Sequence, residues 1–223
     1  AYGKRLIQRP EDWRMLKVLD PGQGMLAIQL QALKLVGEGL GKSEAGGTPF
    51  IATIFSPLAQ AKNLAGGQRL ISHLRSHPDD VMRGLETISA GTIRYIEAAK
   101  ASGISGIFYA VQHARYALLS PVEYQVFGRP FDEEILSAAS DLWFNMVHIH
   151  GEEEIMFDLV ADYPVQCVNW HDRDTDFTLA EGLEQFSGAV SGGVSRCSML
   201  KESPDQALPD ATEALQGAGR RRL

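Results

Sequence analysis

From residue 50 onwards, short apolar runs of strand length recur along the chain, each bounded by turn-forming residues. These runs span residues 50–55, 105–110, 144–149, 165–169 and 189–194, and we expect another to begin at 220–223. Between them, apolar residues recur at helical spacing, which predicts helices. Alternating strands and helices predict a parallel α/β sheet.

The predicted helices carry ordinary start and stop signals. The longest is expected at 78–101, where Pro78 is followed by two acidic residues and Gly103 ends the helix. Ser120 and Glu123 have the spacing of a capping box for the helix that follows them. Further helices are expected near 10–13 and at 25–40, 58–64, 70–74, 121–141 with a break near 128–130, 179–186 and 204–215. The strand at 50–55 is expected to be buried on both faces.

The rest of the chain is organised around residues 144–175. The apolar run at 144–149 leads into His148 and His150, and Gly151 then precedes the acidic run Glu152–Glu154. Carboxylates favour a helix N-terminus because they face the positive end of its dipole. This pattern predicts a strand–turn–helix unit, with the next strand at 165–169.

Polar and ionisable residues cluster where the predicted strands end. In parallel α/β folds, this edge of the sheet binds ligands. The candidates are Gln112, His113, Arg115, Asn169, Trp170, His171, Asp172 and Arg173. An arginine could bind an anionic substrate through two parallel hydrogen bonds. Arg173 also fits a structural ion pair on its loop, and Trp170 also fits a packed aromatic, so both readings stay open.

Two closures of a parallel sheet compete, an open doubly wound sheet and a (β/α)8 barrel. The sequence contains no G-x-G-x-x-G after any predicted strand, which disfavours a dinucleotide-binding sheet. Every strand end carries polar residues, as the mouth of a barrel requires. We therefore predict an α/β (β/α)8 TIM barrel as a single domain over residues 1–223, with 1–49 mainly helical and 50–223 built of βα units. We expect the first strands and the last strand of the barrel to lie outside this sequence.

Composition narrows the class of protein. The 223 residues are 44% hydrophobic and 22% charged, which suits one globular core and excludes a disordered or fibrous chain. A net charge of −7 argues against a nucleic-acid surface. No apolar run reaches a membrane-spanning length and no signal peptide is visible, so we expect a cytoplasmic protein without a membrane partner. The cysteines, Cys167 in a predicted strand and Cys197 in a loop, form no disulfide framework and are expected to be buried or incidental thiols.

Six segments, in order and spacing, resemble the uroporphyrinogen decarboxylase superfamily over nearly the whole chain. They are Ile54–Leu58, Gly106–Tyr109 with Gln112 and His113, Leu119–Tyr124, His148–Gly151, Val168–Trp170 and Gly192–Val194. The resemblance implies a (β/α)8 barrel. The superfamily includes the decarboxylase of haem synthesis, which needs no cofactor, and corrinoid and cobalamin-type methyltransferases that hold zinc.

The decarboxylase pattern is matched only in part. Its active-site tyrosine falls on Asn63, its substrate-binding serine falls on Gln112, and its Asp-Trp pair corresponds to Asn169 and Trp170. Its essential aspartate and arginine motif are expected before Ala1, and its C-terminal histidine after Leu223. These departures at visible positions argue against decarboxylation of uroporphyrinogen itself.

The methyltransferase branch resembles the chain at His148-x-His150-Gly151, where those enzymes carry a His-x-Cys-Gly zinc motif. Imidazole is a good zinc ligand, and positions i and i+2 of a strand point to the same side. His148 and His150 are therefore the candidate metal ligands. The alternative is that they only form hydrogen bonds in the barrel mouth.

The first hypothesis for function is a decarboxylase-family enzyme, a carboxy-lyase without a cofactor, acting on an anionic tetrapyrrole at the barrel mouth. The alternatives are a zinc-dependent methyltransferase acting on a methyl carrier, and a non-catalytic binding protein on a degraded barrel. The expected partners are this small anionic molecule and a second copy of the chain in a homodimer. The predicted catalytic residues are His148 and His113, and the predicted substrate-binding residues are Gln112, Arg115, Asn63, His150, Asn169, Trp170, His171 and Arg173.

Overall fold

The computed structural model describes residues 5–41, 47–152, 154–195 and 207–219. Within these ranges five parallel strands form one sheet in the order β1-β2-β3-β4-β5. The strands are β1 (Ile51–Phe55), β2 (Gly106–Val111), β3 (Met146–Ile149), β4 (Cys167–Trp170) and β5 (Ala189–Ser191). Each strand pairs with the next one in the chain, as in the wall of a barrel, whereas a doubly wound sheet reverses its order. The predicted α/β fold class is confirmed, and the sheet is open between β1 and β5 in the described residues.

Most helices begin where the sequence signals them. The α-helices are α1 (Gly24–Leu40), α2 (Pro57–Ala65), α3 (Gly67–Ser76), α4 (Pro78–Lys100), α5 (Pro121–Phe127), α6 (Arg129–Ala138), α7 (Leu179–Gln185) and α9 (Ala207–Gly217). Two short 3-10 helices are η1 (Pro10–Met15) and η2 (Phe157–Leu159). The capping box is present at α5, because Ser120 Oγ accepts from the Glu123 amide at 3.2 Å and Glu123 Oε2 accepts from the Ser120 amide at 2.7 Å.

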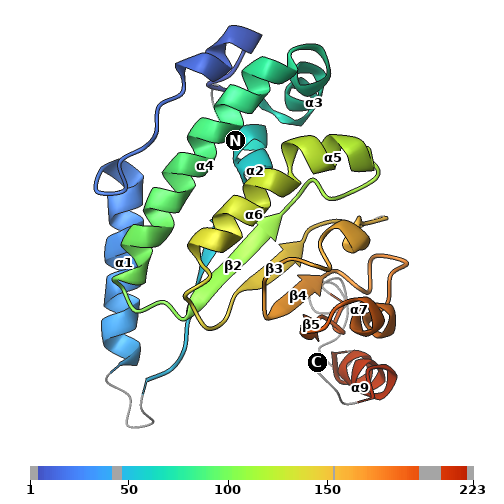
Figure 1. Ribbon diagram of the computed structural model, residues 1–223. Helices are drawn as coiled ribbons and strands as arrows, with labels where there is room; N and C mark the ends of the chain where they lie inside the picture. The colour runs from blue at the N-terminus through green and yellow to red at the C-terminus, as the bar shows by residue number, and fades with distance from the viewer. Residues whose placement is uncertain (1–4, 42–46, 153, 196–206, 220–223) are drawn as a thin grey trace.

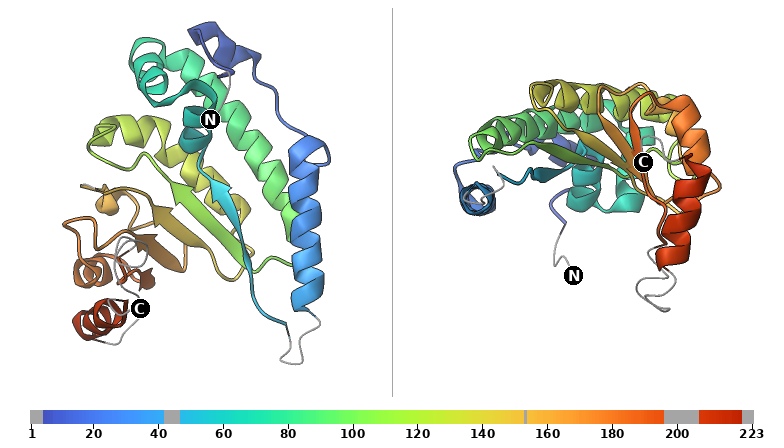
Figure 2. Two further views of the ribbon diagram at one scale, coloured as in Figure 1. Left: turned by 180° about the vertical axis from the view of Figure 1, so that it is seen from behind. Right: turned by 90° about the horizontal axis from the view of Figure 1, so that it is seen from below.

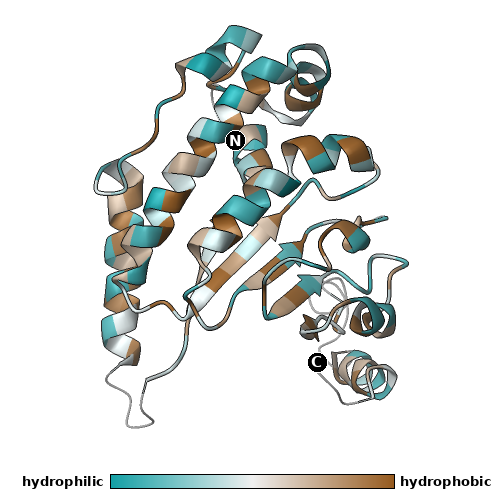
Figure 3. Ribbon diagram, viewed as in Figure 1, coloured by the Kyte–Doolittle hydropathy of each residue, from teal (hydrophilic) through white to brown (hydrophobic). Residues whose placement is uncertain are grey.

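Helices α4 and α6 pack side by side on one face of the sheet (Figure 1). Seen from behind, the strands lie in front of these two helices (Figure 2, left). The strands are mostly hydrophobic, whereas the outward sides of α4 and α6 carry hydrophilic residues (Figure 3). The core between sheet and helices contains fully buried side chains such as Ile107, Val147, Ile149 and Val168. None of the helices in the described ranges is long and apolar enough to cross a membrane.

In the described residues after Gly151, the predicted α-helix does not form. Residues 154–156 instead pair in antiparallel fashion with residues 114–116, and the Met156 amide donates to the carbonyl oxygen of Ala114 at 2.9 Å. These backbone bonds use groups that a helix would have paired within itself. Burial of the apolar side chains at 155–157 holds the segment against the core, and η2 is the remaining helical turn. Tertiary contacts therefore override the local acidic signal.

The strand at 50–55 was predicted to be buried on both faces, and this is wrong. In β1, Ala52 and Ile54 are buried, whereas Thr53 and Phe55 are exposed, with Phe55 42% accessible. The reason is that β1 is an edge strand of the described sheet, so a single neighbouring strand and the helices on one face cover it.

Smaller differences concern ends of elements. The helix near Pro10 is a 3-10 helix, and β3, β4 and β5 are each shorter than their predicted runs. Cys167 is a buried thiol, as predicted, whereas Cys197 lies outside the described residues. The strand expected at 220–223 also lies outside them.

Candidate metal centre

The alternation of strand side chains places the histidines opposite the core. In β3, Val147 and Ile149 are fully buried among apolar side chains. His148 is half-buried on the other face of the strand, and His150, just past the strand, is also half-buried. The polar residues after and within β4 follow the same parity. Two neighbouring strands thus present polar residues on one half-exposed face at their carboxyl ends.

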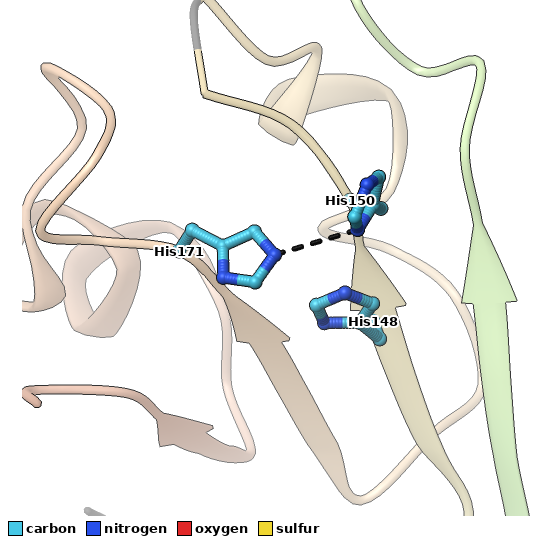
Figure 4. A group of neighbouring side chains, drawn as sticks. All are labelled: His148, His150 and His171. Carbon is cyan, nitrogen blue, oxygen red and sulfur yellow. Dashed lines mark hydrogen bonds between the residues drawn. The ribbon is translucent and has the colours of Figure 1, made fainter. Parts of the chain in front are cut away.

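Three histidines converge at this edge (Figure 4). His148 and His150 come from β3 and the residue after it, and His171 follows β4 directly. Because Ile149 pairs with Trp170 in the sheet, His150 and His171 are the next residues along the two strands. One ligand nitrogen from each ring lies within 4.8 Å of the others.

The rings also contact one another. The centroid of the His148 ring lies 5.6 Å from that of His150 and 5.0 Å from that of His171, and the His150 and His171 centroids are 5.2 Å apart. His171 Nε2 lies 3.4 Å from His150 Nδ1 (Figure 4). Three converging imidazoles are a donor set that zinc favours.

His148 is held on two sides. Its ring stacks on Phe108 of β2 with centroids 5.2 Å apart and planes at 23°. Its Nδ1 lies 2.6 Å from Asn169 Oδ1. The pKa of His148 is lowered to about 4, mainly by burial. The hydrogen bond to Asn169 raises this pKa by a smaller amount, and the two neighbouring histidines lower it. The imidazole is therefore neutral at pH 7, the form that binds a metal.

A cavity of about 210 Å³ lies beside the histidines. Its lining residues are Asn169, Trp170, His171, Asp172, Arg173, Asp174, Ser191, Gly192 and Val194. His171 thus belongs both to the cluster and to the cavity wall. Asp172 Oδ1 accepts from the Gly193 amide at 2.7 Å, and burial raises the pKa of this carboxyl group. The cavity has the size and polarity of a site for a small polar molecule.

Arg173 makes its hydrogen bonds with groups outside the histidine cluster. Its guanidinium donates to the carbonyl oxygens of Gly193 at 3.1 Å and Asp210 at 2.8 Å, and to Glu213 Oε2 at 2.9 Å. Two of these bonds tie the loop after β4 to α9, and the bond to Gly193 ties it to the segment after β5. The structural interpretation of Arg173 accounts for all of them, and its substrate-binding role stays a prediction.

Trp170 is 2% exposed and donates from Nε1 to the carbonyl oxygen of Phe177 at 2.9 Å. Its ring contacts Phe157 at a centroid distance of 5.0 Å. These contacts match the reading of Trp170 as a packed aromatic.

The predicted residues after β2 differ in their surroundings. Arg115 packs over Gly151, because a Cβ atom on that glycine would lie 2.7 Å from the arginine side chain. Its cationic side chain thus lies beside the residue that follows His150. Gln112 Oε1 accepts from Lys62 Nζ at 3.3 Å. His113 is 2% exposed, and in the described part of the chain its Nδ1 has no hydrogen-bond partner.

Asn63 is not brought to the histidines. It lies on α2 and lines a different cavity, of about 470 Å³, between the N-terminal segment, α1, α4 and β1. The two cavities share no lining residue. A substrate at the histidines would therefore not reach Asn63 through the smaller cavity.

From the sequence, His148 and His150 were predicted to be metal ligands, and His171 was predicted to bind the substrate. The structure brings all three rings together, so His171 is the ligand candidate that the sequence missed. The signal was present in its position, one residue past the strand that pairs with β3. Phe108 and Ser191 were also missed, because nothing in their own sequence neighbourhood marks them.

Known proteins of one family are similar to this chain over most of its length. A profile of the family described as Uroporphyrinogen decarboxylase (URO-D) matches residues 2–222. A methylcobamide:CoM methyltransferase, MtbA, from Methanosarcina acetivorans is 25% identical over 217 residues, covering 97% of this chain and 62% of the relative. A uroporphyrinogen decarboxylase from Syntrophotalea carbinolica is 27% identical over 216 residues, covering 90% of this chain and 61% of the relative.

Among solved structures, a methyltransferase from Methanosarcina mazei is similar with a TM-score of 0.77 and 19% identity, covering 90% of this chain and 59% of that one. At this identity the similarity concerns the fold alone. The chain spans about three fifths of the length of the proteins it matches. The two sequence relatives carry different activities in their names.

Proposed function

The chain belongs to the uroporphyrinogen decarboxylase family, and we propose on this basis that it binds zinc through His148, His150 and His171 and transfers a methyl group to a thiol. The observation that supports this proposal is the convergence of three imidazoles within 4.8 Å at the carboxyl edge of the sheet. Cofactor-free decarboxylation has no need of such a donor set. A methyltransferase is also the relative that matches 97% of the chain.

The donor set fits zinc because three protein ligands leave one coordination position open. When bound there, zinc would act as a Lewis acid that lowers the pKa of a thiol acceptor at the open position. The surrounding residues prepare His148 to act as a ligand. The buried surroundings keep His148 neutral, and Phe108 and Asn169 hold its ring in place.

In the proposed reaction, the thiol acceptor loses its proton to water and its sulfur forms the new bond to the methyl carbon. The bond between that carbon and the methyl donor breaks, and the donor keeps the electron pair. The cavity of about 210 Å³ beside His171 is the place for the acceptor. Arg115 does not line this cavity, and its role in binding an anionic substrate stays a prediction.

Metal analysis is the first test. Protein stripped with a chelator and incubated with zinc should retain about one zinc per chain. Each of His148→Ala, His150→Ala and His171→Ala should lower zinc affinity by at least about tenfold. His77→Ala, which removes an exposed histidine elsewhere, is the matched control and should bind zinc as the parent does. Equal zinc binding by all four variants would refute the site.

Methyl transfer is the second test, with methylcobalamin as donor and coenzyme M as acceptor, the pair suggested by the name of the MtbA relative. The expected result is loss of methylcobalamin absorbance that depends on zinc and on His171. Zinc binding without any transfer would leave a metal site but contradict the methyltransferase proposal.

Decarboxylation of uroporphyrinogen is the second candidate, and the 27% identity to a named decarboxylase over 90% of the chain favours it. The same preparation, freed of metal, should be assayed for carbon dioxide release from uroporphyrinogen. Metal-independent turnover would replace the methyltransferase proposal with decarboxylation. Absence of both activities, together with tight binding of either substrate, would favour the binding-protein alternative.

A further inference from the structure

A row of hydrogen-bonded side chains crosses three strands and ends on His148. In the register of the sheet, His148 of β3 is paired with Asn169 of β4, which is paired with Ser191 of β5. Asn169 Nδ2 donates to the backbone oxygen of Ser191 at 2.8 Å and lies 3.3 Å from its hydroxyl group. We infer that Asn169, anchored by Ser191, is a positioning residue that keeps the proton of His148 on Nδ1 and leaves Nε2 as the metal-binding nitrogen. This inference rests on the proposed zinc site.

The chemistry of the acceptors fixes the direction of each bond. A backbone carbonyl oxygen can only accept, so the Asn169 atom near Ser191 must be the NH2 group. The Asn169 atom 2.6 Å from His148 is therefore the amide oxygen, which also can only accept. Its partner, His148 Nδ1, must carry the hydrogen. A neutral imidazole with its proton on Nδ1 has its lone pair on Nε2.

The rest of the environment limits how the ring can turn. Phe108 covers one face of the ring, with centroids 5.2 Å apart, and His150 and His171 approach it edge-on. The hydrogen bond to Asn169 then fixes the remaining rotation of the ring about its bond to Cβ. Partners of this kind behind metal-binding histidines commonly contribute about 10–100-fold in metal affinity.

The tautomer can be measured without metal. Nitrogen-15 spectra of the histidine side chains in the metal-free chain distinguish a protonated Nδ1 from a protonated Nε2. The parent should show His148 with a protonated Nδ1. Asn169→Leu should shift it to the other form or to a mixture, whereas Asn169→Asp keeps an acceptor for Nδ1 but loses the donor to Ser191, and should preserve the protonated Nδ1 only in part. An unchanged tautomer in Asn169→Leu would overturn the inference.

Metal affinity tests the consequence. Competition with a chelating dye should show zinc binding about 10–100-fold weaker in Asn169→Leu than in the parent, and Asn169→Asp, which keeps only the acceptor, should restore part of the affinity. The absorption spectrum of the cobalt-substituted chain should differ from that of the parent in Asn169→Leu. In Asn169→Asp it should lie closer to the spectrum of the parent. Gln166→Leu is the matched control, because it removes another side-chain amide beside β4. The oxygen of that amide accepts from the backbone N–H of Asn145 at 2.6 Å.

The outcomes separate this inference from the proposed function. If the parent binds zinc through its three histidines and Asn169→Leu binds it equally well, the positioning role is refuted while the zinc site stands. If the parent does not bind zinc, the proposed function fails and this inference with it, whatever tautomer is observed. Equal losses in Asn169→Leu and Gln166→Leu would indicate a general loss of structure and would also overturn it.

Discussion

His113 makes the stability of the chain depend on pH. Its side chain is 2% exposed, and Nδ1 has no hydrogen-bond partner within the described residues. Burial, together with the positive charges of Lys62 and Arg115, lowers its pKa from 6.5 to about 3. The folded chain therefore keeps this imidazole neutral at a pH where the unfolded chain protonates it.

The sign and size of the effect follow from this difference. Above pH 6.5 both states are neutral at His113, so its full contribution to stability is present. As the pH falls towards 3, the unfolded state binds the extra proton, and the free energy of unfolding decreases by about 1.4 kcal/mol per pH unit. The expected loss is about 2 kcal/mol at pH 5 and about 5 kcal/mol near pH 3. The larger value is comparable to the whole stability of a small domain, about 5–15 kcal/mol.

Urea unfolding followed by circular dichroism at pH 7, 6 and 5 measures this loss in the parent chain and in His113→Leu. Only the difference between the two is informative, because His148, with its pKa lowered to about 4, titrates in the same range. The parent should lose about 2 kcal/mol more than the variant between pH 7 and pH 5. Equal pH dependence would refute the buried, neutral state of His113. Methyl-transfer and decarboxylation assays of the variant test its predicted catalytic role.

Three further substitutions test a buried hydrogen bond and the packing of two glycines. Tyr124→Phe removes the hydroxyl group that donates to the buried Asp132 carboxylate at 2.5 Å, and should lower the free energy of unfolding by about 2 kcal/mol in urea; no change would mean that water or another donor replaces it. Gly106→Ala should prevent β2 from packing, because its Cβ would lie 1.4 Å from the carbonyl oxygen of Phe144. In contrast, the Cβ of Gly39→Ala in α1 would meet no neighbour within 4 Å, so this change should raise the free energy of unfolding by about 0.5–1 kcal/mol. A Gly106→Ala chain with an unchanged melting temperature would contradict the close approach.

Features that depend on near neighbours in the chain could be predicted from the sequence. Ser120 and Glu123 lie three residues apart, and their reciprocal capping bonds need no distant partner. The strands of the sheet could be found because their apolar runs are short, distinct and followed by helical spacing. The same local period placed His148 and His150 on one side of their strand.

Which strand ends meet depends on contacts between segments that are distant in the chain. His171 is 21 residues from His150 in the chain, and the register of β3 with β4 brings their rings together. The tertiary structure also decided against the helix after Gly151, since backbone groups at 154–156 found partners at 114–116 and buried side chains followed them into the core. Both outcomes depend on hydrogen bonds and packing between distant segments. Their free energies exceed local preferences of a few tenths of a kcal/mol per residue, and no pattern within one segment encodes them.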